Sequence, residues 1–224
     1  MTNYPWTAFY SEKAKSFDAD DLPTLHLGAL MKKAAEKYGE RPACTTVLPN
    51  GASGGLTYQE LDRYSDDLAI YLREELKLVP SDVVGIMSPN CNGYPIASFG
   101  VFKSGCITTN INPLYTVPEM EHQLQDSNVK VLIVIDMFGD KVDAVIDKTN
   151  VEHVITLSVV DFFPGLKKLL IGFVLKNIKK VIPTMRTVSL KLDAVLAIGR
   201  SIRSANNLSV DRYIEASSPD DTAV

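Results

Sequence analysis

Residues that could carry out chemistry are few in this sequence, and most of them stand alone. The three histidines, His26, His122 and His153, are far apart, and no motif places a nucleophile beside any of them. We interpret each as a packed or surface residue rather than a general base. The three cysteines form no CxxC pair and have no histidine at metal-ligand spacing, so we predict no structural zinc site and a reducing, cytoplasmic environment. They are Cys44, Cys91 and Cys106.

The sequence also lacks the common glycine-rich signatures that bind phosphate. Neither GxxxxGK followed by Ser or Thr nor GxGxxG occurs, and GxSxG and HExxH are absent too. The glycine cluster at 51–55 lies in a predicted hairpin and opens no helix, so we interpret it as a turn. Asp136 follows an apolar strand and could face a ligand, but we favour a role in capping the next helix. The residues alone therefore define no reaction and no catalytic residue.

Residues 1–78 are predicted to form an N-terminal arm, a helix, a β-hairpin and a second helix. Thr24 would cap the first helix, which we expect over about 25–38. The hairpin strands are expected over 41–48 and 55–57, because Pro, Asn and Gly between them favour a turn.

Thr57 and Glu60 have the spacing of a capping box, which predicts a second helix that runs to about residue 76. One stripe of this helix is apolar, and we expect the opposite face to be exposed and acidic. The acidic residues are Asp62, Asp66, Asp67, Glu74 and Glu75.

Residues 79–215 alternate short apolar segments with helical ones. Apolar strands joined by crossovers of helix length are typical of an α/β fold with a mainly parallel sheet flanked by helices. In such a sheet, ligands usually bind beyond the carboxyl ends of the strands. The stretch Ser88–Thr116 contains two of these ends. We expect strands at 83–87, 106–109, 130–135 and 153–157, and helices near 93–104, 117–126 and 138–148.

A basic amphipathic segment occupies residues 162–203. It contains nine Lys or Arg residues and only one acidic residue, Asp193. A helix over 165–182 would place four lysines on one arc beside or opposite an apolar face. Such a helix can lie in a membrane interface, and the alternative is a solvated basic helix packed on its own domain. The membrane-surface candidates are Lys168, Lys176, Lys179 and Lys180.

The composition narrows the class of protein. A chain of 224 residues with 46% hydrophobic content can bury a sizeable core, and a formal charge of −4 argues against a nucleic-acid partner. The N-terminus has no secretory signal, and no apolar run approaches the ~20 residues that a membrane span needs. We expect a cytoplasmic protein, with the inner face of the cell membrane as a candidate contact.

Three stretches resemble the adenylate-forming acyl-CoA synthetases. They are LTYQELDRYSDDLAIYL (56–72), DVVGIMSPNCNGYPIASFGVFKSGCITTNINPLYT (82–116) and PEMEHQLQDSNVKVLIV (118–134). Within that superfamily, NPLYT (112–116), EHQLQDS (121–127) and the basic segment KNIKKVIP (176–183) most resemble bacterial long-chain fatty-acid CoA ligases. The signature residues, which we assign a structural role, are Asn112, Pro113, Tyr115, Thr116 and Glu119.

The resemblance implies the first part of the large N-terminal domain of such a synthetase. A complete family member uses ATP and Mg²⁺ to convert a long-chain fatty acid to an acyl-adenylate, and coenzyme A then displaces AMP. In the family, a sequence like that at 216–224 is a linker leading into a Ser/Thr/Gly-rich phosphate loop. The resemblance therefore implies a non-catalytic scaffold portion, and it assigns no catalytic, cofactor-binding or metal residue to this chain.

Two alternatives stay open beside the ligase interpretation. A membrane-surface or assembly module could act through the basic segment, whereas an independent Rossmann-like nucleotide binder is disfavoured because the glycine fingerprint is missing. The resemblance also implies that residues 25–75 pack on later strands in the family. An exposed apolar surface there would favour self-association.

Overall fold

The computed structural model describes residues 5–15, 26–218 and 221–224. The described chain begins with two short helices, the 3-10 helix η1 (Pro5–Phe9) and α1 (Glu12–Lys15). The helix α2 (Leu27–Tyr38) follows and ends at Gly39. Its N-cap is His26, whose Nδ1 accepts a hydrogen bond of 2.9 Å from the Gly28 amide. The predicted cap Thr24 lies outside the described residues.

A separate two-stranded antiparallel sheet comes next. It consists of β1 (Pro42–Val47) and β2 (Ser53–Thr57), close to the predicted hairpin. Thr57 then caps α3 (Tyr58–Ile70), and both hydrogen bonds of the predicted capping box are present. The helix continues as a π-helical turn, η3 (Tyr71–Glu75).

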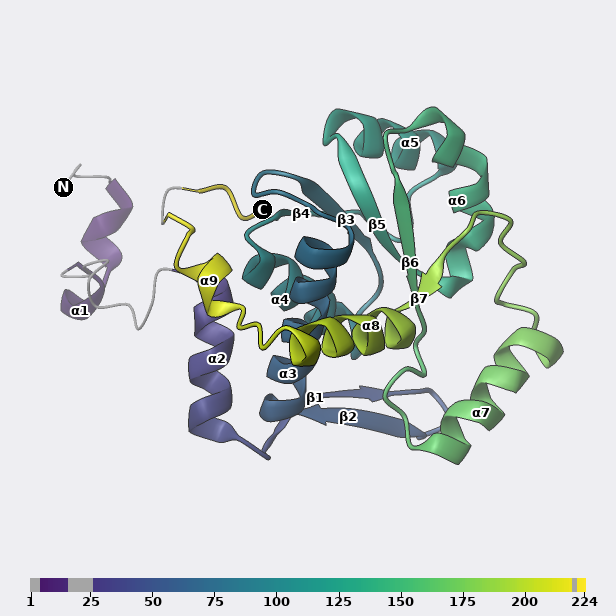
Figure 1. The fold of residues 1–224 in the computed structure, drawn as a ribbon, viewed down its shortest axis with the longest axis horizontal. Helices are drawn as coiled ribbons and strands as arrows, with labels where there is room; N and C mark the ends of the chain where they lie inside the picture. The colour runs from purple at the N-terminus through teal and green to yellow at the C-terminus, as the bar shows by residue number, and fades with distance from the viewer. Residues whose placement is uncertain (1–4, 16–25, 219–220) are drawn as a thin grey trace.

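The large sheet has five parallel strands in the order β4-β3-β5-β6-β7 (Figure 1). Four of them were predicted: β3 (Val83–Met87), β4 (Ile107–Asn110), β5 (Val129–Ile135) and β6 (His153–Leu157). The fifth, β7 (Leu190–Lys191), was not predicted. Two residues are too few to produce a period, and pairing with β6 creates this strand.

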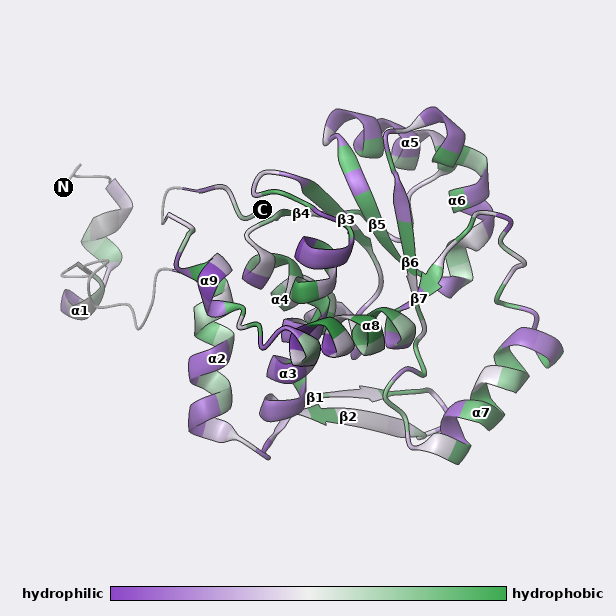
Figure 2. Cartoon of the chain, in the orientation of Figure 1, coloured by the Kyte–Doolittle hydropathy of each residue, from purple (hydrophilic) through white to green (hydrophobic). Residues whose placement is uncertain are grey.

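Helices cover both faces of the sheet. Side chains alternate along β5, so Val131, Ile133 and Ile135 pack in one apolar cluster while Leu132 and Val134 pack in another. The first cluster lies under α3, α4 (Gly93–Ser104) and α8 (Leu192–Ala205). The second lies under α5 (Val117–Asp126) and α6 (Gly139–Val145). Figure 2 shows the hydrophobic residues concentrated along these strands. This is the mainly parallel α/β fold that the sequence predicts.

Short connecting helices complete the described chain. The 3-10 helices η4 (Asp136–Phe138) and η5 (Ile146–Lys148) flank α6, so the single helix expected near 138–148 is divided into shorter pieces. The small helix α9 (Asp211–Ile214) follows α8. Near the end of the chain, the amide of Thr108 in β4 donates to the carbonyl oxygen of Ala223 at 2.9 Å.

The sequence predicts that the acidic face of α3 is exposed to solvent. This prediction is wrong for the three aspartates of the helix. The Lys103 ammonium of α4, which is fully buried, lies 2.6 Å from a carboxylate oxygen of Asp62 and of Asp66. Asp67 is also fully buried and contacts Arg200 and Arg203 of α8 at 3.2 and 2.9 Å. These basic partners come from distant positions in the chain, so helical periodicity could not reveal them.

The basic helix is shorter than predicted. The helix α7 spans Gly165–Phe173, and the π-helical turn η6 (Val174–Ile178) continues it. Lys179 caps this turn, and Lys180 has a positive φ of 50°. Lys179 and Lys180 therefore follow the helix rather than lie within it.

Candidate functional site

The carboxyl ends of β3 and β4 form a polar edge. Ser88 follows β3, Asn110 ends β4, and both face an open hollow of about 380 Å³. The hydroxyl of Tyr94, from the first turn of α4, donates to Oδ1 of Asn110 at 3.0 Å. Asn90 and Asn112 contribute further polar groups to the same hollow. Parallel strands place these groups together because all of their carboxyl ends lie on one edge.

Asn92 has a structural role at this edge. Its side chain is buried, and its amide nitrogen donates to the carbonyl oxygen of Gly54 in β2 at 2.8 Å. The backbone amide of Asn92 also donates to the hydroxyl of Thr46 in β1 at 2.9 Å. These two bonds hold the start of α4 against the hairpin.

The signature residues form the turn that enters α5. Oδ1 of Asn112 accepts from the amide of Leu114 at 3.0 Å. The amide and hydroxyl of Thr116 donate to Oε2 of Glu119 at 2.8 and 2.7 Å, and these bonds lower the pKa of Glu119. Lys141 of α6 donates to the carbonyl oxygens of Pro113 and Tyr115. The structure thus places four signature residues in the turn before α5 and Glu119 in the first turn of that helix; a structural role for them remains a proposal.

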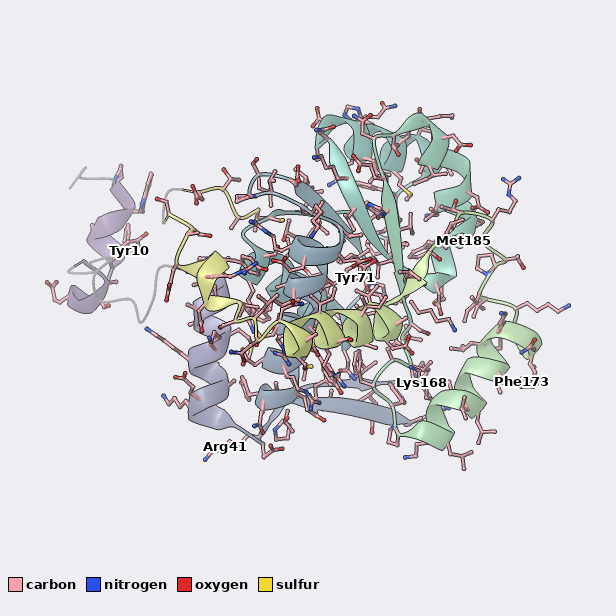
Figure 3. The ribbon with its side chains drawn as sticks, viewed as in Figure 1. Tyr10, Arg41, Tyr71, Lys168, Phe173 and Met185 are labelled. Carbon is pink, nitrogen blue, oxygen red and sulfur yellow. The ribbon has the colours of Figure 1, made fainter. Side chains whose placement is uncertain are left out.

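A second hollow of about 340 Å³ lies beyond the carboxyl ends of β5 and β6. Lys168 of α7 reaches into it and contacts Asp161 and Asp193 at 3.2 and 3.1 Å. Asp136, at the end of β5, lines the same hollow. One wall is apolar and is formed in part by Leu169 and Phe173 of α7. Figure 3 shows Lys168 on the side of α7 that faces the sheet.

Burial raises the pKa of Asp136 to about 6, although hydrogen bonds from Ser158 and the Met137 amide oppose this rise. Its Oδ1 is buried without a partner among the described residues. The pKa of Asp161 is raised by burial as well, whereas the Lys168 ammonium opposes that shift. The site therefore holds a carboxyl group that can exchange a proton near neutral pH, beside an ion pair. Asp136 lies within η4, and its side chain caps no helix there.

Replacing Asp136 by asparagine is expected to stabilise the protein at neutral pH by about 1–3 kcal/mol. The folded-state pKa of about 6 lies above the usual 3.8, so the folded protein holds the proton more tightly than the unfolded chain. The resulting penalty appears as the pH rises through this window, and it is complete above pH 6. Urea unfolding of both proteins at pH 4 and pH 7 measures it. A difference in stability that does not change between these pH values would contradict the assignment.

The three histidines considered in the sequence do not lie together in one site. His122 and His153 are exposed on α5 and β6, and His26 caps α2. No group of three His, Cys, Asp or Glu residues within the described part of the chain is arranged to hold a metal ion. The sequence analysis missed Asp161 and the inward direction of Lys168. Asp161 stands alone in an apolar run, and an isolated acid of this kind could have marked it.

None of the described helices is long and apolar enough to cross a membrane. The four predicted membrane-surface lysines divide into two groups. Lys168 is engaged with Asp161 and Asp193 at the second hollow. Lys176, Lys179 and Lys180 are exposed, and Lys176 also borders the second hollow.

Comparison with known proteins identifies a family. Residues 31–223 match the family model described as AMP-binding enzyme. The chain is 36% identical over 154 residues to a long-chain fatty-acid CoA ligase of Salmonella typhimurium. The aligned region covers 69% of this chain and 27% of that protein. It is 37% identical over 172 residues to a long-chain fatty-acid CoA ligase of Haemophilus influenzae, covering 76% of this chain and 30% of that protein.

Solved structures share the fold. The crystal structure of a long-chain fatty-acid CoA ligase from Archaeoglobus fulgidus superposes with a TM-score of 0.57 at 22% identity, covering 90% of this chain and 32% of that one. The didomain of a carboxylic acid reductase from Segniliparus rugosus, solved with AMP, gives a TM-score of 0.63 at 15% identity. It covers 81% of this chain and 27% of that one. The chain spans less than a third of the length of these relatives. Because the family model matches most of its length, the chain belongs to the AMP-binding enzyme family.

Proposed function

We propose that this chain is the first part of a long-chain fatty-acid CoA ligase. The observation that supports this most is the 36–37% identity to curated long-chain fatty-acid CoA ligases over 69–76% of the chain. In the complete protein, ATP and Mg²⁺ would convert the fatty acid to an acyl-adenylate. Coenzyme A would then displace AMP to give the thioester. Adenylation helps because a carboxylate oxygen is a poor leaving group until it is bonded to phosphate.

We further propose that these 224 residues act as a scaffold and do not catalyse adenylation alone. The sequence contains none of the common phosphate-binding glycine motifs. The hollow at Tyr94 and Asn110 offers hydroxyl and amide groups but no cation for a triphosphate. The residues of this hollow therefore do not fit ATP and Mg²⁺, and we assign no step of the reaction to them. The hollow would instead border a nucleotide site completed by other residues.

Two measurements on the purified chain test the scaffold role. Calorimetric titration with ATP, NAD and coenzyme A should show no tight binding. Incubation with ATP, Mg²⁺ and oleate should give no acyl-adenylate. Tight binding of NAD or ATP would favour an independent nucleotide binder. Adenylate formation at the rate of an intact ligase would contradict the scaffold role.

Self-association is a separate proposal, supported by exposed apolar side chains on α2 and the hairpin. Leu27 and Leu30 are 40% and 42% exposed, and Val47 is 65% exposed. Light scattering after size exclusion should therefore show a mass that rises with protein concentration. Leu30→Glu should reduce the rise, whereas Leu114→Ser, which alters an exposed side chain on a different surface, should not. A monomer at every concentration would contradict this proposal.

A role at a membrane surface, the alternative suggested by the basic segment, depends on α7 and is independent of the ligase proposal.

A further inference from the structure

The outward face of α7 is apolar. Leu166, Leu169, Leu170 and Phe173 are 73%, 71%, 60% and 60% exposed, and their spacing of three and four residues places them on one stripe. The described part of α7 and η6 contains no buried residue. In Figure 3, Phe173 lies on the side of α7 away from the sheet. A solvated basic helix would show the reverse arrangement, with its leucines and phenylalanine packed inside.

Positive charge surrounds this stripe. Lys167 and Lys176 flank it, Lys179 and Lys180 follow it, and all four are exposed. The sequence contains no acidic residue between Asp161 and Asp193. Across the described residues, none of these four lysines takes part in an ion pair of 4.0 Å or less. An exposed apolar stripe with lysines at its sides is the arrangement of a helix that lies in the headgroup region of a bilayer.

Contacts of Lys168, and of the loop that precedes α7, fix the orientation of the helix. Lys168 joins it to Asp161 and to Asp193 of α8, and Asp161 also accepts from the Ser158 amide at 2.7 Å. Phe162, just before the helix, packs its ring 5.1 Å from the ring of Tyr64. These contacts turn the Lys168 face inward. Leu169 and Phe173 also border the second hollow, but they remain 71% and 60% exposed, so most of the apolar stripe faces outward.

The segment after η6 is also attached to the body. The amides of Arg186 and Thr187 donate to the Asp143 carboxylate of α6 at distances of 2.8 to 3.1 Å. These bonds are the main reason that the pKa of Asp143 is lowered to about 2. The helix therefore projects from the body, and the segments before and after it are both held by hydrogen bonds or ion pairs (Figure 1).

We propose that α7 and η6 form a docking surface for an anionic lipid bilayer. The apolar stripe enters the headgroup region, and Lys167, Lys176, Lys179 and Lys180 contact lipid phosphates and carboxylates. Charge complementarity selects this occupant, because four unopposed lysines would repel a second copy of the same face. Lys168 is not part of the docking surface; it positions the helix.

Vesicle co-sedimentation of the complete 224-residue chain tests the proposal. The protein should bind phosphatidylcholine vesicles that contain phosphatidylserine, and high salt should weaken binding. Charge reversal at Lys176, Lys179 and Lys180 should lower the partition coefficient about tenfold or more. Lys33→Glu with Lys37→Glu provides a charge control on α2. Leu169→Ser with Phe173→Ser should also lower binding, whereas Leu114→Ser with Val188→Ser should not, although these control residues are 85% and 91% exposed.

Fluorescence gives a second readout, which reports insertion of the stripe directly and does not depend on a variant that loses binding. The chain has one tryptophan, Trp6, so Trp6→Phe with Phe173→Trp places the only indole on the stripe. Its emission should shift to shorter wavelength with anionic vesicles, and brominated lipid should quench it. Absence of a shift and of sedimentation would overturn the proposal. So would equal loss of binding in the control variants, or a stripe that mediates dimerisation without lipid.

Discussion

Replacing Lys103 by methionine is expected to lower the free energy of unfolding by about 3–5 kcal/mol at neutral pH. The ammonium is fully buried and lies 2.6 Å from carboxylate oxygens of both Asp62 and Asp66, whose side chains are only 22% and 17% exposed. Methionine fills a similar volume but has no positive charge, so the carboxylates of Asp62 and Asp66 lose their shared ion-pair partner. The loss therefore comes from the unpaired charges rather than from a cavity. Urea denaturation at pH 7 measures it.

A matched control is Lys148→Met, which removes the ion pair with Glu121 at 3.0 Å. The Lys148 side chain is 57% exposed, so this change should cost less than about 1 kcal/mol. Burial already raises the pKa of Asp66 in the native protein, and the loss of Lys103 should raise it further. At acidic pH, where Asp66 takes up a proton, the cost of Lys103→Met should therefore shrink. Equal effects of the two substitutions would contradict a buried charge network.

The second large effect is expected at Gly199, where α8 crosses α3. A Cβ at this position would lie 1.9 Å from the carbonyl oxygen of Asp67, which is too close for any side chain. The helices must separate to admit alanine, and this also pulls Arg200 and Arg203 from Asp67. We expect Gly199→Ala to reduce stability by about 3 kcal/mol or more, despite the better helix propensity of alanine.

Gly172→Ala is the control for this substitution. Gly172 also lies inside a helix, but the nearest atom to a methyl group added there would be Cγ2 of Val160, at 4.0 Å. Alanine should therefore stabilise the protein by about 0.5–1 kcal/mol through its helix propensity. Thermal melting of both variants separates a steric effect from a propensity effect. A stable Gly199→Ala protein would show that α8 does not pack on α3 this closely.

Local signals predicted much of the fold. Strands β3 and β6 and helices α4 and α5 have the predicted bounds. Their ends are set by nearby residues, such as Gly105 in the left-handed region and the Thr116–Glu119 pair. The apolar character of β5 on both faces also indicated a sheet covered on each side.

Long-range contacts were beyond this kind of prediction. The basic partners of Asp67 lie more than 130 positions away in the chain, so the acidic stripe of α3 was assigned to solvent. The strand β7 depends on β6 for its existence. The direction of α7 depends on Lys168, whose partners Asp161 and Asp193 are on opposite sides of it in the sequence. Apolar residues occur on both arcs of this helix, so periodicity could not show which arc faces outward.

The ligase proposal is tested most directly by a chimera with the Haemophilus influenzae ligase, which is 37% identical over 172 residues. This chain would replace the corresponding first part of that protein, and circular dichroism would confirm that the product folds. We predict oleate-dependent exchange between ATP and pyrophosphate by the chimera, and none by the 224-residue chain alone. A folded chimera without exchange, or exchange by the chain alone at the rate of the intact ligase, would contradict the account.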